Sequence, residues 1–409
     1  MRLLLRCLAC LGLLLSAPAQ ARTPPLTILI SLDGFRPDYL GHGRTPNLDR
    51  IAASGIRATM KPSFPTLTFP NHYALVTGLR PDRNGMVENK MRDPDHPGAL
   101  FDMKDSKAKT EPFWWEQAQP LWATAEQAGL HTATVFWPGS DAAIHGVRPG
   151  AWLPYDAAVT SAQRVDFVLD WARRPAATRP RFVALYLDVV DKASHADGIT
   201  SAHNLAAIAE VDAAVGRLAR RLKAMRRPAN LVIVSDHGME DIPPAHVLPL
   251  DTVVDRAIMD VVTPGGPIVS VWPKPGHEAE VAAKLLRPLP HLHCWRREDL
   301  PARFHYGQNP RVPPFYCLVT DAGWRYTEDK PKDHATGDHG YDPDDPRMAA
   351  LFLASGPAFK GRAVLPQFDN VDVYPLLRDL LGLPRATDID GTDAPFRDVL
   401  RRTNPHRPS

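Results

Sequence analysis

The chain has 409 residues, of which 44% are hydrophobic and 23% are charged. These values are typical of a globular protein that buries a full core, and they exclude disordered and fibrous classes. Lysine and arginine number 48 against 46 aspartate and glutamate, so the chain lacks the basic excess expected of a nucleic-acid-binding protein. The length indicates either two domains or one large α/β domain with a long insertion.

The first 21 residues have the pattern of a secretory signal peptide. Arg2 and Arg6 precede an apolar run that continues to Leu15, and Ala19-Gln20-Ala21 offers a small-residue cleavage site. The run is shorter than the ~18–20 residues that cross a bilayer, and no later segment is long and uncharged enough to do so. We expect cleavage after Ala21 and export to the periplasm or the medium, with lipidation at Cys10 as a less favoured alternative.

Removal of this segment leaves two cysteines, Cys294 and Cys317. In an oxidising compartment the two thiols could form a disulfide. Two separate buried thiols are an equally good interpretation, because the sequence does not show the distance between their Cα atoms.

Short apolar runs alternate with helical patterns along the chain. Helical patterns occur at residues 45–55, at residues 120–129 and from Leu205 to Leu222. The alternation predicts an α/β fold with a doubly wound, mostly parallel sheet and helices on both faces. The runs expected to form buried parallel strands are Leu26–Leu32, Thr132–Phe136, Arg181–Leu187, Asn230–Val234 and Ala349–Ala354.

The alternation is interrupted from about Glu240 to His334. This stretch contains Pro264-Gly265-Gly266-Pro267, a β-like run at Ile268–Val271 and a helical pattern near Ala279–Leu286. It predicts a small inserted α+β lobe. We therefore expect one catalytic domain over residues 22–400 that carries this insertion, followed by a flexible tail at residues 401–409.

Metal-ligating side chains follow the ends of several predicted strands. In open α/β sheets, ligands bind beyond the carboxyl ends of the strands. Aspartate and histidine are donors of the kind that hold zinc, and ligand sets at one edge suit a pair of metal ions. A single Asp-His pair is more often a helix cap or a surface loop, but several such sets favour a metal site. They comprise Asp33, Asp188, Asp191, His195, Asp236 and His237, with Asp338 and His339 in a later loop.

A nucleophile is offered by the segment at residues 64–73, where Thr66 and Thr68 precede a helical pattern that ends at Gly78. A threonine ahead of a helix N-terminus lies beside unpaired N–H groups and a positive dipole end, which favour a phosphoryl oxygen. A metal bound to its Oγ would help to ionise the hydroxyl. Helix capping is the simpler role for either threonine. His72 lies four residues beyond Thr68, and we expect its ring to serve packing or support.

Five motifs stand in a fixed order: SLDG at residues 31–34, TFPNHY at 68–73, DKASH at 191–195, SDHGM at 235–239 and DHGYD at 338–342. Together they resemble the nucleotide pyrophosphatase/phosphodiesterase family, which belongs to the alkaline phosphatase superfamily. The resemblance extends from about Leu26 to Leu381, and TFPNHY followed by SDHGM is highly specific. It implies an alkaline phosphatase-like catalytic domain.

The resemblance also implies a ligand set and two catalytic residues. Thr68 resembles the family nucleophile, which makes Thr66 a neighbour. Asn89 lies 21 positions after Thr68 in an Asn-Lys pair and resembles the residue that donates to a non-bridging phosphoryl oxygen. The ligands implied for two Zn²⁺ ions are Asp33, Asp236, His237 and Thr68 for one ion, and Asp191, His195 and His339 for the other.

The resemblance implies in-line attack of Thr68 on phosphorus, a threonyl-phosphate ester and its hydrolysis. The expected substrates are nucleotide phosphodiesters and pyrophosphates, including nucleoside triphosphates cleaved to monophosphates. Monoesterases commonly oppose the extra phosphate charge with arginine, and no arginine adjoins a ligand cluster here, which favours diesters. The resemblance further implies a base held between aromatic rings. Phe69 is the inner face and Tyr155 the candidate for the other, with a packed loop aromatic as the alternative for Tyr155.

Two other functions are considered. A choline- or lipid-directed phosphodiesterase, or a phosphonate hydrolase, would use the same threonine and ligands, and Phe113-Trp114-Trp115 could bind choline by cation–π contact. A catalytically inactive zinc-binding module is the alternative of another class, although Thr68 and an unbroken ligand set argue against it. No membrane span or nucleic-acid surface is predicted, and the sequence does not indicate an oligomeric state.

Overall fold

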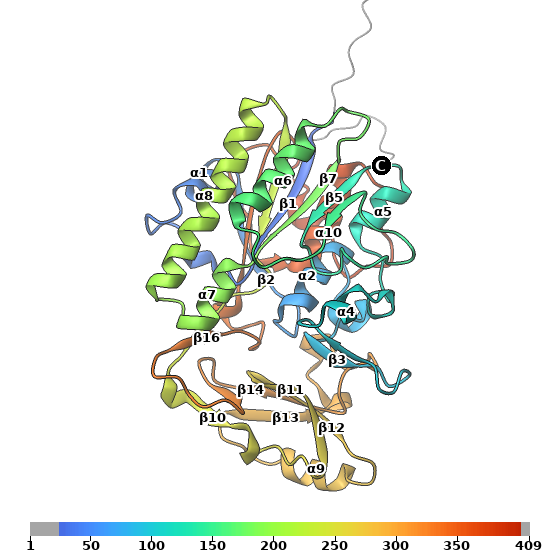
Figure 1. Ribbon diagram of the computed structural model, residues 1–409, viewed down its shortest axis with the longest axis vertical. Helices are drawn as coiled ribbons and strands as arrows, with labels where there is room; N and C mark the ends of the chain where they lie inside the picture. Colours follow the sequence, from blue (N-terminus) through green and yellow to red (C-terminus); the bar gives the residue numbers. More distant parts are fainter. Residues whose placement is uncertain (1–23, 402–409) are drawn as a thin grey trace, which may run out of the picture.

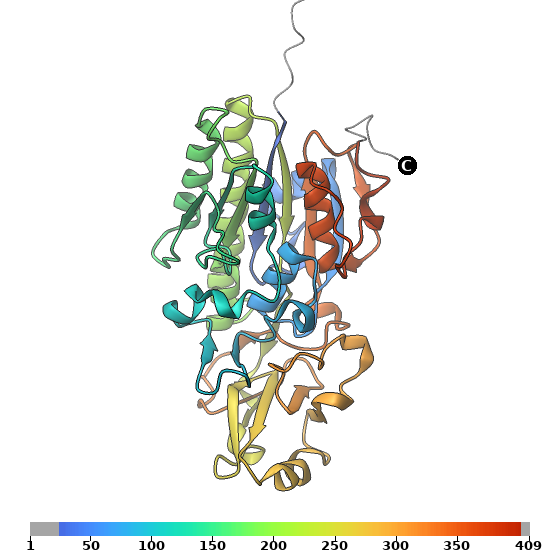
Figure 2. The same ribbon diagram turned by 90° about the vertical axis from the view of Figure 1, so that its right-hand side faces the viewer.

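The computed structural model describes residues 24–401, in which a central sheet lies between two layers of helices and a smaller lobe lies beyond one end of that sheet (Figures 1 and 2). The predicted signal peptide at residues 1–21 and residues 402–409 of the predicted tail lie outside the described residues. Across residues 24–401, no helix combines the length and the apolar character needed to cross a membrane.

The central sheet has the strand order β18-β2-β17-β8-β1-β7-β5-β6, with β19 also paired to β2. β1 lies between β7 and β8 and is parallel to both, and β5 and β6 extend the parallel part. The predicted doubly wound, mostly parallel sheet is confirmed. Its strands are β1 (Leu26–Leu32), β2 (Ile56–Lys61), β5 (Thr132–Val135), β6 (Ala151–Leu153), β7 (Phe182–Leu187), β8 (Ala229–Val234), β17 (Ala350–Ser355), β18 (Ala363–Val364) and β19 (Phe368–Asp369).

One strand direction differs from the prediction. The run at Ala349–Ala354 forms β17, but this strand is antiparallel to both β8 and β2. The prediction was wrong because an apolar run reports burial on both faces and carries no information about direction. β2 was not predicted, since its buried residues alternate with more exposed ones and it lacks a continuous apolar run.

The two faces of the sheet are covered by different helices. Leu29 of β1 packs in the cluster that includes α2, α5 and α10, whereas Ile28 and Ile30 pack against α1, α6, α7 and α8. This alternation follows from the two-residue repeat of a strand, and it buries β1 completely. The helices are α1 (Pro46–Ser54), α2 (Thr68–Thr77), α5 (Leu121–Gln127), α6 (Ser161–Arg173), α7 (Val189–Asp197), α8 (Ala202–Ala224) and α10 (Val373–Leu381).

The predicted stripe on α8 is confirmed as a core-facing surface. Ser201 caps the helix by accepting a hydrogen bond from the backbone N–H of Asn204. Residues recurring every three or four positions then fall on one side and pack against the sheet. The buried members of the stripe are Ile208, Val211, Val215, Leu218 and Leu222.

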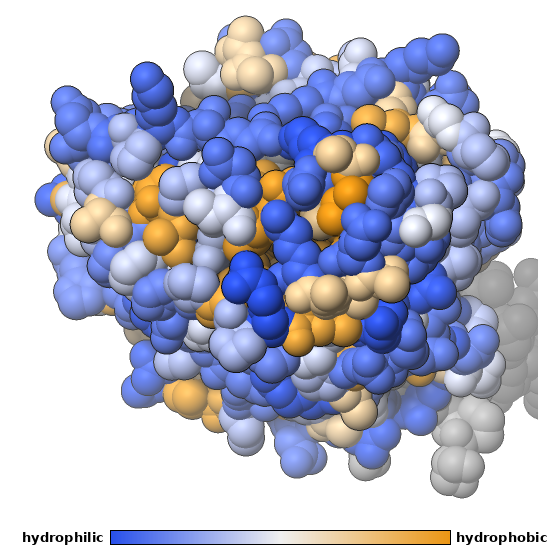
Figure 3. All heavy atoms as spheres, turned by 90° about the horizontal axis from the view of Figure 1, so that it is seen from below, coloured by the Kyte–Doolittle hydropathy of each residue, from blue (hydrophilic) through white to orange (hydrophobic). Residues whose placement is uncertain are grey.

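A second sheet of six strands forms the lobe below the carboxyl ends of β1, β7 and β8 (Figure 1). Its order is β10-β15-β11-β12-β14-β13, antiparallel except for the β10–β15 pair. The lobe has its own core, which includes side chains from α9. Seen from below, it presents mostly hydrophilic residues with apolar ones in small patches (Figure 3). Its elements are β10 (Val247–Pro249), β11 (Met259–Gly266), β12 (Ile268–Pro273), α9 (Glu278–Leu285), β13 (Leu292–Arg296), β14 (Phe315–Val319) and β15 (Arg325–Thr327).

The two cysteines of the lobe are bonded to each other. Cys294 of β13 and Cys317 of β14 are partners in the antiparallel register and form a disulfide. Of the two interpretations that the sequence allows, the structure therefore has the disulfide.

Two short ladders lie between the central sheet and the lobe (Figure 1). β3 (Lys90–Arg92) pairs with β4 (Leu100–Asp102), and β9 (Glu240–Ile242) pairs with β16 (Thr336–Asp338). The short helices α3 (Pro81–Asn84) and α4 (Ser106–Thr110) flank β3 and β4 in the chain. The β9–β16 ladder joins segments that are far apart in sequence, whereas β3 and β4 are close together in the chain.

Candidate active site

Acidic side chains gather at the carboxyl edge of the sheet because three neighbouring parallel strands end there. Asp33 follows β1 directly, and Asp236 lies two residues beyond β8. α7 begins just after β7 and carries Asp191 in its first turn and His195 in its last. A spacing of four residues places these two side chains on the same face of the helix. The sheet topology therefore brings together the ligands that were predicted from three separate motifs.

His339 is brought in by the β9–β16 ladder. β9 follows the SDHGM motif closely, and β16 ends at Asp338, which is the register partner of Glu240. His339 is the next residue, and its ring stacks on that of His237 with centroids 3.5 Å apart and an interplanar angle of 12°. Antiparallel pairing of β9 with β16 thus brings together two ligands, His237 and His339, that are about one hundred residues apart in the chain.

The predicted ligands form two groups that share one carboxylate. Donor atoms of Asp191, His195 and His339 lie within 4.8 Å of one another, and so do those of Asp33, Asp191 and His237. Oδ1 of Asp191 is 3.4 Å from Nε2 of His195 and 3.7 Å from Nε2 of His339. Nε2 of His237 is 3.6 Å from Oδ1 of Asp33. The resemblance placed Asp191 with one ion only, whereas the structure puts it within both groups.

Asp236 adjoins the group that contains His237. Its Oδ2 lies 3.0 Å from Nε2 of His237, and its Oδ1 accepts a hydrogen bond of 3.2 Å from the backbone N–H of Gly34. Asp236 therefore lies where the resemblance places it, beside Asp33 and His237. It also helps to hold the turn that follows β1.

The three histidines are oriented alike. In each ring the Nδ1–H donates to a backbone carbonyl: His237 to Gly238 at 2.9 Å, His195 to Gly337 at 2.9 Å and His339 to Thr66 at 2.8 Å. This pattern fixes the tautomer of the neutral ring, in which Nε2 is the acceptor. Metal-ligating histidines in proteins are held in the same way.

Buried carboxylate oxygens without donors complete the fit to a cation site. Oδ1 of Asp33, Oδ1 of Asp191 and Oδ2 of Asp236 are buried and accept no hydrogen bond from any residue that the structure describes. Burial and the charges of Asp236 and Asp191 raise the pKa of Asp33 well above its usual value. Such a cluster of buried acceptors requires positive charge, and divalent cations satisfy it.

The charges around Asp191 point the same way. Burial would raise the pKa of Asp191, but the nearby rings of His195, His339 and His237 outweigh it and lower the pKa to about 2. Conversely, burial would lower the pKa of His195, but Asp191 raises it to about 9. Burial and the neighbouring rings of His237 and His195 lower the pKa of His339 to about 3. Positive charge is therefore favoured on His195 beside Asp191 and disfavoured on His339.

The hydroxyls of the two candidate threonines have different surroundings in the structure. Thr68 is the first residue of α2, and its Oγ1 lies 3.2 Å from Nε2 of His237. The hydroxyl of Thr66 instead donates to the backbone carbonyl of Tyr341 at 2.7 Å. Leu67 is the N-cap residue of α2, so neither threonine caps the helix with its side chain. Thr68 alone of the two has its hydroxyl beside the ligand cluster.

Asn89 is bonded to the backbone of α2 at Phe69, the residue that follows Thr68. Its Oδ1 accepts a hydrogen bond of 2.9 Å from the N–H of Phe69. This bond orients the amide and leaves its NH₂ group to donate elsewhere. Asn89 thus lies beside the candidate nucleophile.

The two candidate base-binding rings differ in exposure. Phe69 is 7% exposed and packs against Phe101 and Trp115 at centroid distances of 5.8 and 5.9 Å. Tyr155 is 37% exposed, and its hydroxyl donates to Asp188 at 2.6 Å and accepts from Lys192 at 2.7 Å. These bonds fasten Tyr155 to the start of α7, beside Asp191.

The Phe113-Trp114-Trp115 cluster belongs to the interior. Trp114 and Trp115 are buried, and the guanidinium of Arg311 lies over Phe113 and Trp114 at 5.0 and 5.2 Å from the ring centroids. A cation of the protein itself therefore occupies the position that the choline interpretation would give to a ligand.

Sequence reasoning did not identify Tyr186. Its hydroxyl donates to Oδ2 of Asp33 in a short hydrogen bond. Tyr186 lies within β7, two residues before Asp188, and its position in an apolar strand gives no signal of this contact. His72 behaves as expected: its Nδ1–H donates to the carbonyl of Thr68 at 2.8 Å, and Nε2 accepts from Ser31 at 2.8 Å.

Two motif glycines permit close approaches within the site. Gly34 has φ +66°, and a Cβ on it would lie 3.2 Å from Cα of Asp191. A Cβ on Gly238 would lie 1.9 Å from the carbonyl oxygen of Arg347. Any other residue at either position would displace a ligand-bearing turn.

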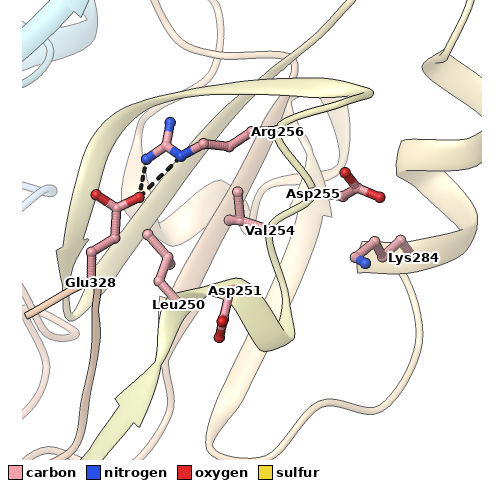
Figure 4. Close-up of a pocket in the computed structure, with 7 residues that line it drawn as sticks. All are labelled: Leu250, Asp251, Val254, Asp255, Arg256, Lys284 and Glu328. Atoms are coloured by element: carbon pink, nitrogen blue, oxygen red, sulfur yellow. Dashed lines mark hydrogen bonds and ion pairs between the residues drawn. The ribbon is translucent and has the colours of Figure 1, made fainter. Parts of the chain in front are cut away.

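A separate cavity of about 330 Å³ lies in the lobe (Figure 4). It is lined by Leu250, Asp251, Val254, Asp255, Arg256, Lys284 and Glu328, and none of these is a predicted site residue. Arg256 and Glu328 form an ion pair across it. The charges of Arg256 and Glu328 therefore partly neutralise each other. The cavity contains none of the predicted catalytic or metal-binding residues.

A mostly parallel sheet with buried aspartates, histidines and a threonine at its carboxyl edge is the architecture of metal-dependent hydrolases of the alkaline phosphatase type. Residues 27–342 match the sequence model of the family described as type I phosphodiesterase / nucleotide pyrophosphatase. The chain belongs to this family, whose members are hydrolases. The predicted family is therefore confirmed.

Two curated relatives differ in how much of them the chain covers. It is 36% identical over 371 residues to the bis(5'-adenosyl)-triphosphatase of Xenopus laevis, which covers 90% of this chain and 79% of that protein. It is also 36% identical over 409 residues to ectonucleotide pyrophosphatase/phosphodiesterase family member 1 of Mus musculus. That match covers 96% of this chain but only 44% of the mouse protein, so the chain spans less than half the length of this relative.

Solved structures of related proteins share the fold. An inactive threonine-to-alanine variant of murine ectonucleotide pyrophosphatase / phosphodiesterase 5, in complex with AMP, has a TM-score of 0.86 and 32% identity. The match covers 92% of this chain and 100% of that chain. The human protein of the same name has a TM-score of 0.84 and 33% identity, covering 92% and 99% of the two chains. The alkaline phosphatase-like fold is confirmed.

Proposed function

We propose that the chain hydrolyses nucleotide phosphodiester and pyrophosphate bonds, with Thr68 as the nucleophile and two Zn²⁺ ions as cofactors. The observation that carries the proposal is the position of the Thr68 hydroxyl, 3.2 Å from Nε2 of His237 and beside a cluster of buried carboxylates. The solved relative with AMP, which is inactive when a threonine is replaced by alanine, supports it.

The two ions would be held by the two ligand groups. We assign Asp33, Asp236, His237 and Thr68 to one ion, and Asp191, His195 and His339 to the other, with Asp191 in reach of both groups. Carboxylate oxygens together with imidazole nitrogens are typical of zinc sites. When bound, the ions would lower the pKa of the attacking hydroxyl and stabilise charge on the leaving oxygen.

The chain's own residues would act on the substrate as follows. Thr68 Oγ loses its proton to solvent and forms a bond to phosphorus while the bond to the leaving oxygen breaks, which gives a threonyl-phosphate ester and the leaving group. Water then loses a proton to solvent as it bonds to phosphorus, and the Thr68 oxygen leaves and takes up a proton. At the start of α2 the N–H of Phe69 donates to Asn89 and Pro70 has no N–H, so we assign the donor role to the NH₂ group of Asn89, which would donate to a non-bridging oxygen.

Recognition of a nucleotide diester would rest on aromatic rings and on the lack of an arginine paired with the described ligand carboxylates. We propose that a base stacks between Phe69 and Tyr155, with Tyr155 held by Asp188 and Lys192. Within residues 24–401, no arginine forms an ion pair with Asp33, Asp191 or Asp236. The neutral amide of Asn89 suits the single charge of a diester.

The test compares the p-nitrophenyl ester of thymidine 5'-monophosphate with p-nitrophenyl phosphorylcholine. We expect the thymidine ester to be hydrolysed at least about tenfold faster, and Thr68→Ala to lower kcat by about 1,000-fold or more. Thr66→Ala is the matched control, because its hydroxyl bonds to Tyr341 outside the cluster, and it should retain most of the activity. Preference for the choline ester would overturn the substrate assignment. Unchanged turnover by Thr68→Ala would favour the alternative that the chain is a catalytically inactive zinc-binding module.

We also propose that the chain is exported, with residues 1–21 as a signal peptide and residues 22–400 as one catalytic domain that carries the lobe. The Cys294–Cys317 disulfide supports an oxidising destination. N-terminal sequencing of the protein recovered from the periplasm or the medium tests this. A mature N-terminus at Arg22 is expected, and recovery of the uncleaved chain from the cytoplasm would contradict the proposal.

A further inference from the structure

Glu88 is a buried carboxylate that the proposed mechanism does not use. Its side chain is 1% exposed. Oε2 accepts hydrogen bonds from the hydroxyls of Thr263 at 2.8 Å and Ser270 at 3.0 Å. No lysine, arginine or histidine of residues 24–401 forms an ion pair with it, and the titratable groups that face it are the phenols of Tyr306 and Tyr316. A buried glutamate without a cation is costly and calls for a role.

The position of Glu88 in the chain connects two parts of the molecule. Asn89 is the next residue, and its Oδ1 accepts from the N–H of Phe69 on α2. The partners of Glu88 lie instead in the lobe, on neighbouring antiparallel strands: Thr263 on β11 and Ser270 on β12. Two consecutive residues thus join the catalytic helix on one side and the lobe on the other.

The connection between β13 and β14 also holds the backbone of this segment. The hydroxyl of Tyr306 donates to the carbonyl of Val87 at 3.0 Å, and Arg311 donates to the carbonyl of Gly85 at 2.9 Å. Residues 85–89 are therefore bonded to β11, to β12 and to the connection between β13 and β14, in addition to the bond between Asn89 and α2. Of the residues in this segment that make these contacts, Glu88 is the one directly before Asn89 in the chain.

We infer that Glu88 is a positioning residue through which the lobe sets the place of the Asn89 amide. Its carboxylate ties β11 and β12 to the segment that presents Asn89, so the NH₂ group meets the phosphoryl oxygen in a fixed position. This inference rests on the donor role of Asn89 in the proposed function. The lobe thereby contributes to turnover without touching the substrate at this point.

The expected signature is a loss in kcat with little change in KM. A donor that acts on charge developing in the transition state affects kcat more than substrate binding. We expect Glu88→Ala to lower kcat for the thymidine ester about tenfold and to change KM by less than about twofold. Glu88→Gln keeps an acceptor oxygen for Thr263 and Ser270, and it should stay within about twofold of the wild-type kcat.

A double-mutant cycle with Asn89→Ala gives the decisive test. If Glu88 acts through Asn89, Glu88→Ala changes kcat by less than about twofold in the Asn89→Ala background. The same tenfold loss in both backgrounds, or no loss in either, would overturn the inference. An unchanged kcat for Asn89→Ala alone would instead refute the donor role in the proposed function, so the two failures are distinguishable.

Thr263→Val removes one hydroxyl from the lobe side and serves if Glu88→Ala does not fold. It should lower kcat about threefold, and again only where Asn89 is present. A loss that is independent of Asn89, or no loss at all, contradicts the inference. Thermal unfolding of each variant, measured under the assay conditions, shows that the folded protein is being compared.

Discussion

Oγ1 of Thr68 lies 3.2 Å from Nε2 of His237, although 169 residues separate the two in the chain. Thr68 opens α2 on one face of the sheet, and His237 follows β8 within it. Their proximity places a hydroxyl at the edge of a buried cluster of aspartates and histidines. The proposed reaction depends on this contact.

Zinc content should depend on Asp191 more than on His195. Oδ1 of Asp191 belongs to both ligand groups, whereas His195 belongs to one. Asp191→Asn should therefore reduce bound zinc from two ions per chain to fewer than one, whereas His195→Ala should keep at least one. Elemental analysis of dialysed proteins measures this. Two ions retained by Asp191→Asn would contradict the shared position of Asp191.

Tyr186→Phe should weaken metal binding without changing a ligand. The Tyr186 hydroxyl donates to Oδ2 of Asp33, and its loss leaves a buried ligand oxygen less well oriented. We expect the affinity for zinc to fall by about 10-fold or more. Competition with a chromophoric chelator measures the change. Tyr326→Phe, at a buried tyrosine of the lobe that donates to the carbonyl of Pro290, is the matched control, and equal affinities of the two variants would refute the expectation.

The free energy of unfolding should depend on pH through Glu88. Burial raises the pKa of Glu88 from its usual 4.5 to about 7, against the opposing hydrogen bonds of Thr263 and Ser270. The folded state therefore holds this proton more tightly than the unfolded state. The stability of the wild type falls between pH 4.5 and pH 7 by about 3 kcal/mol from this group alone.

Glu88→Gln cannot ionise, so its stability relative to the wild type should rise by that amount over the same interval. Urea unfolding of both proteins from pH 4.5 to pH 8 measures the difference. Glu298→Gln makes the same change at an exposed glutamate and is the control. A difference between Glu88→Gln and the wild type that stays constant with pH would show that Glu88 does not titrate in this way.

The lobe should lose stability when its disulfide is removed. Cys294 and Cys317 are separated by 23 positions, and closing a loop of this length contributes about 3 kcal/mol. A variant with both cysteines replaced by alanine should therefore unfold at lower urea concentration than the wild type. Reductant should lower the wild-type midpoint to that of the variant and leave the variant unchanged. An equal midpoint for the oxidised wild type and the variant would contradict this contribution.

Some features of the fold follow from local sequence. The apolar runs at β1, β7 and β8 are long enough to define buried strands, and the aspartates that follow them mark the carboxyl edge of the sheet. The direction of β17 did not follow, because burial on both faces looks the same in either direction. β2 escaped prediction because only one of its faces is fully buried.

The candidate site, like the fold, could be predicted only in part from the sequence. The motifs were sufficient to nominate Asp33, Thr68, Asp191, His237 and their partners, since each lies within a few residues of a strand end or helix start. The shared position of Asp191, the Tyr186–Asp33 bond and the burial of Glu88 between Thr263 and Ser270 were not apparent. Tyr186 and Asp33 are 153 residues apart in the chain, and Glu88 is 175 and 182 residues from Thr263 and Ser270.

The amino-acid sequence by itself thus determined the alternation of strands and helices, the order of the motifs and the residue types available for chemistry. The contacts between the aspartate oxygens and the histidine nitrogens of the site were decided by pairing between distant strands. The most important pairs are β1 with β7, β1 with β8, and β9 with β16. The physical reason is that periodicity and capping act over a few residues. The distances within the site arise only when separate segments are packed into one core.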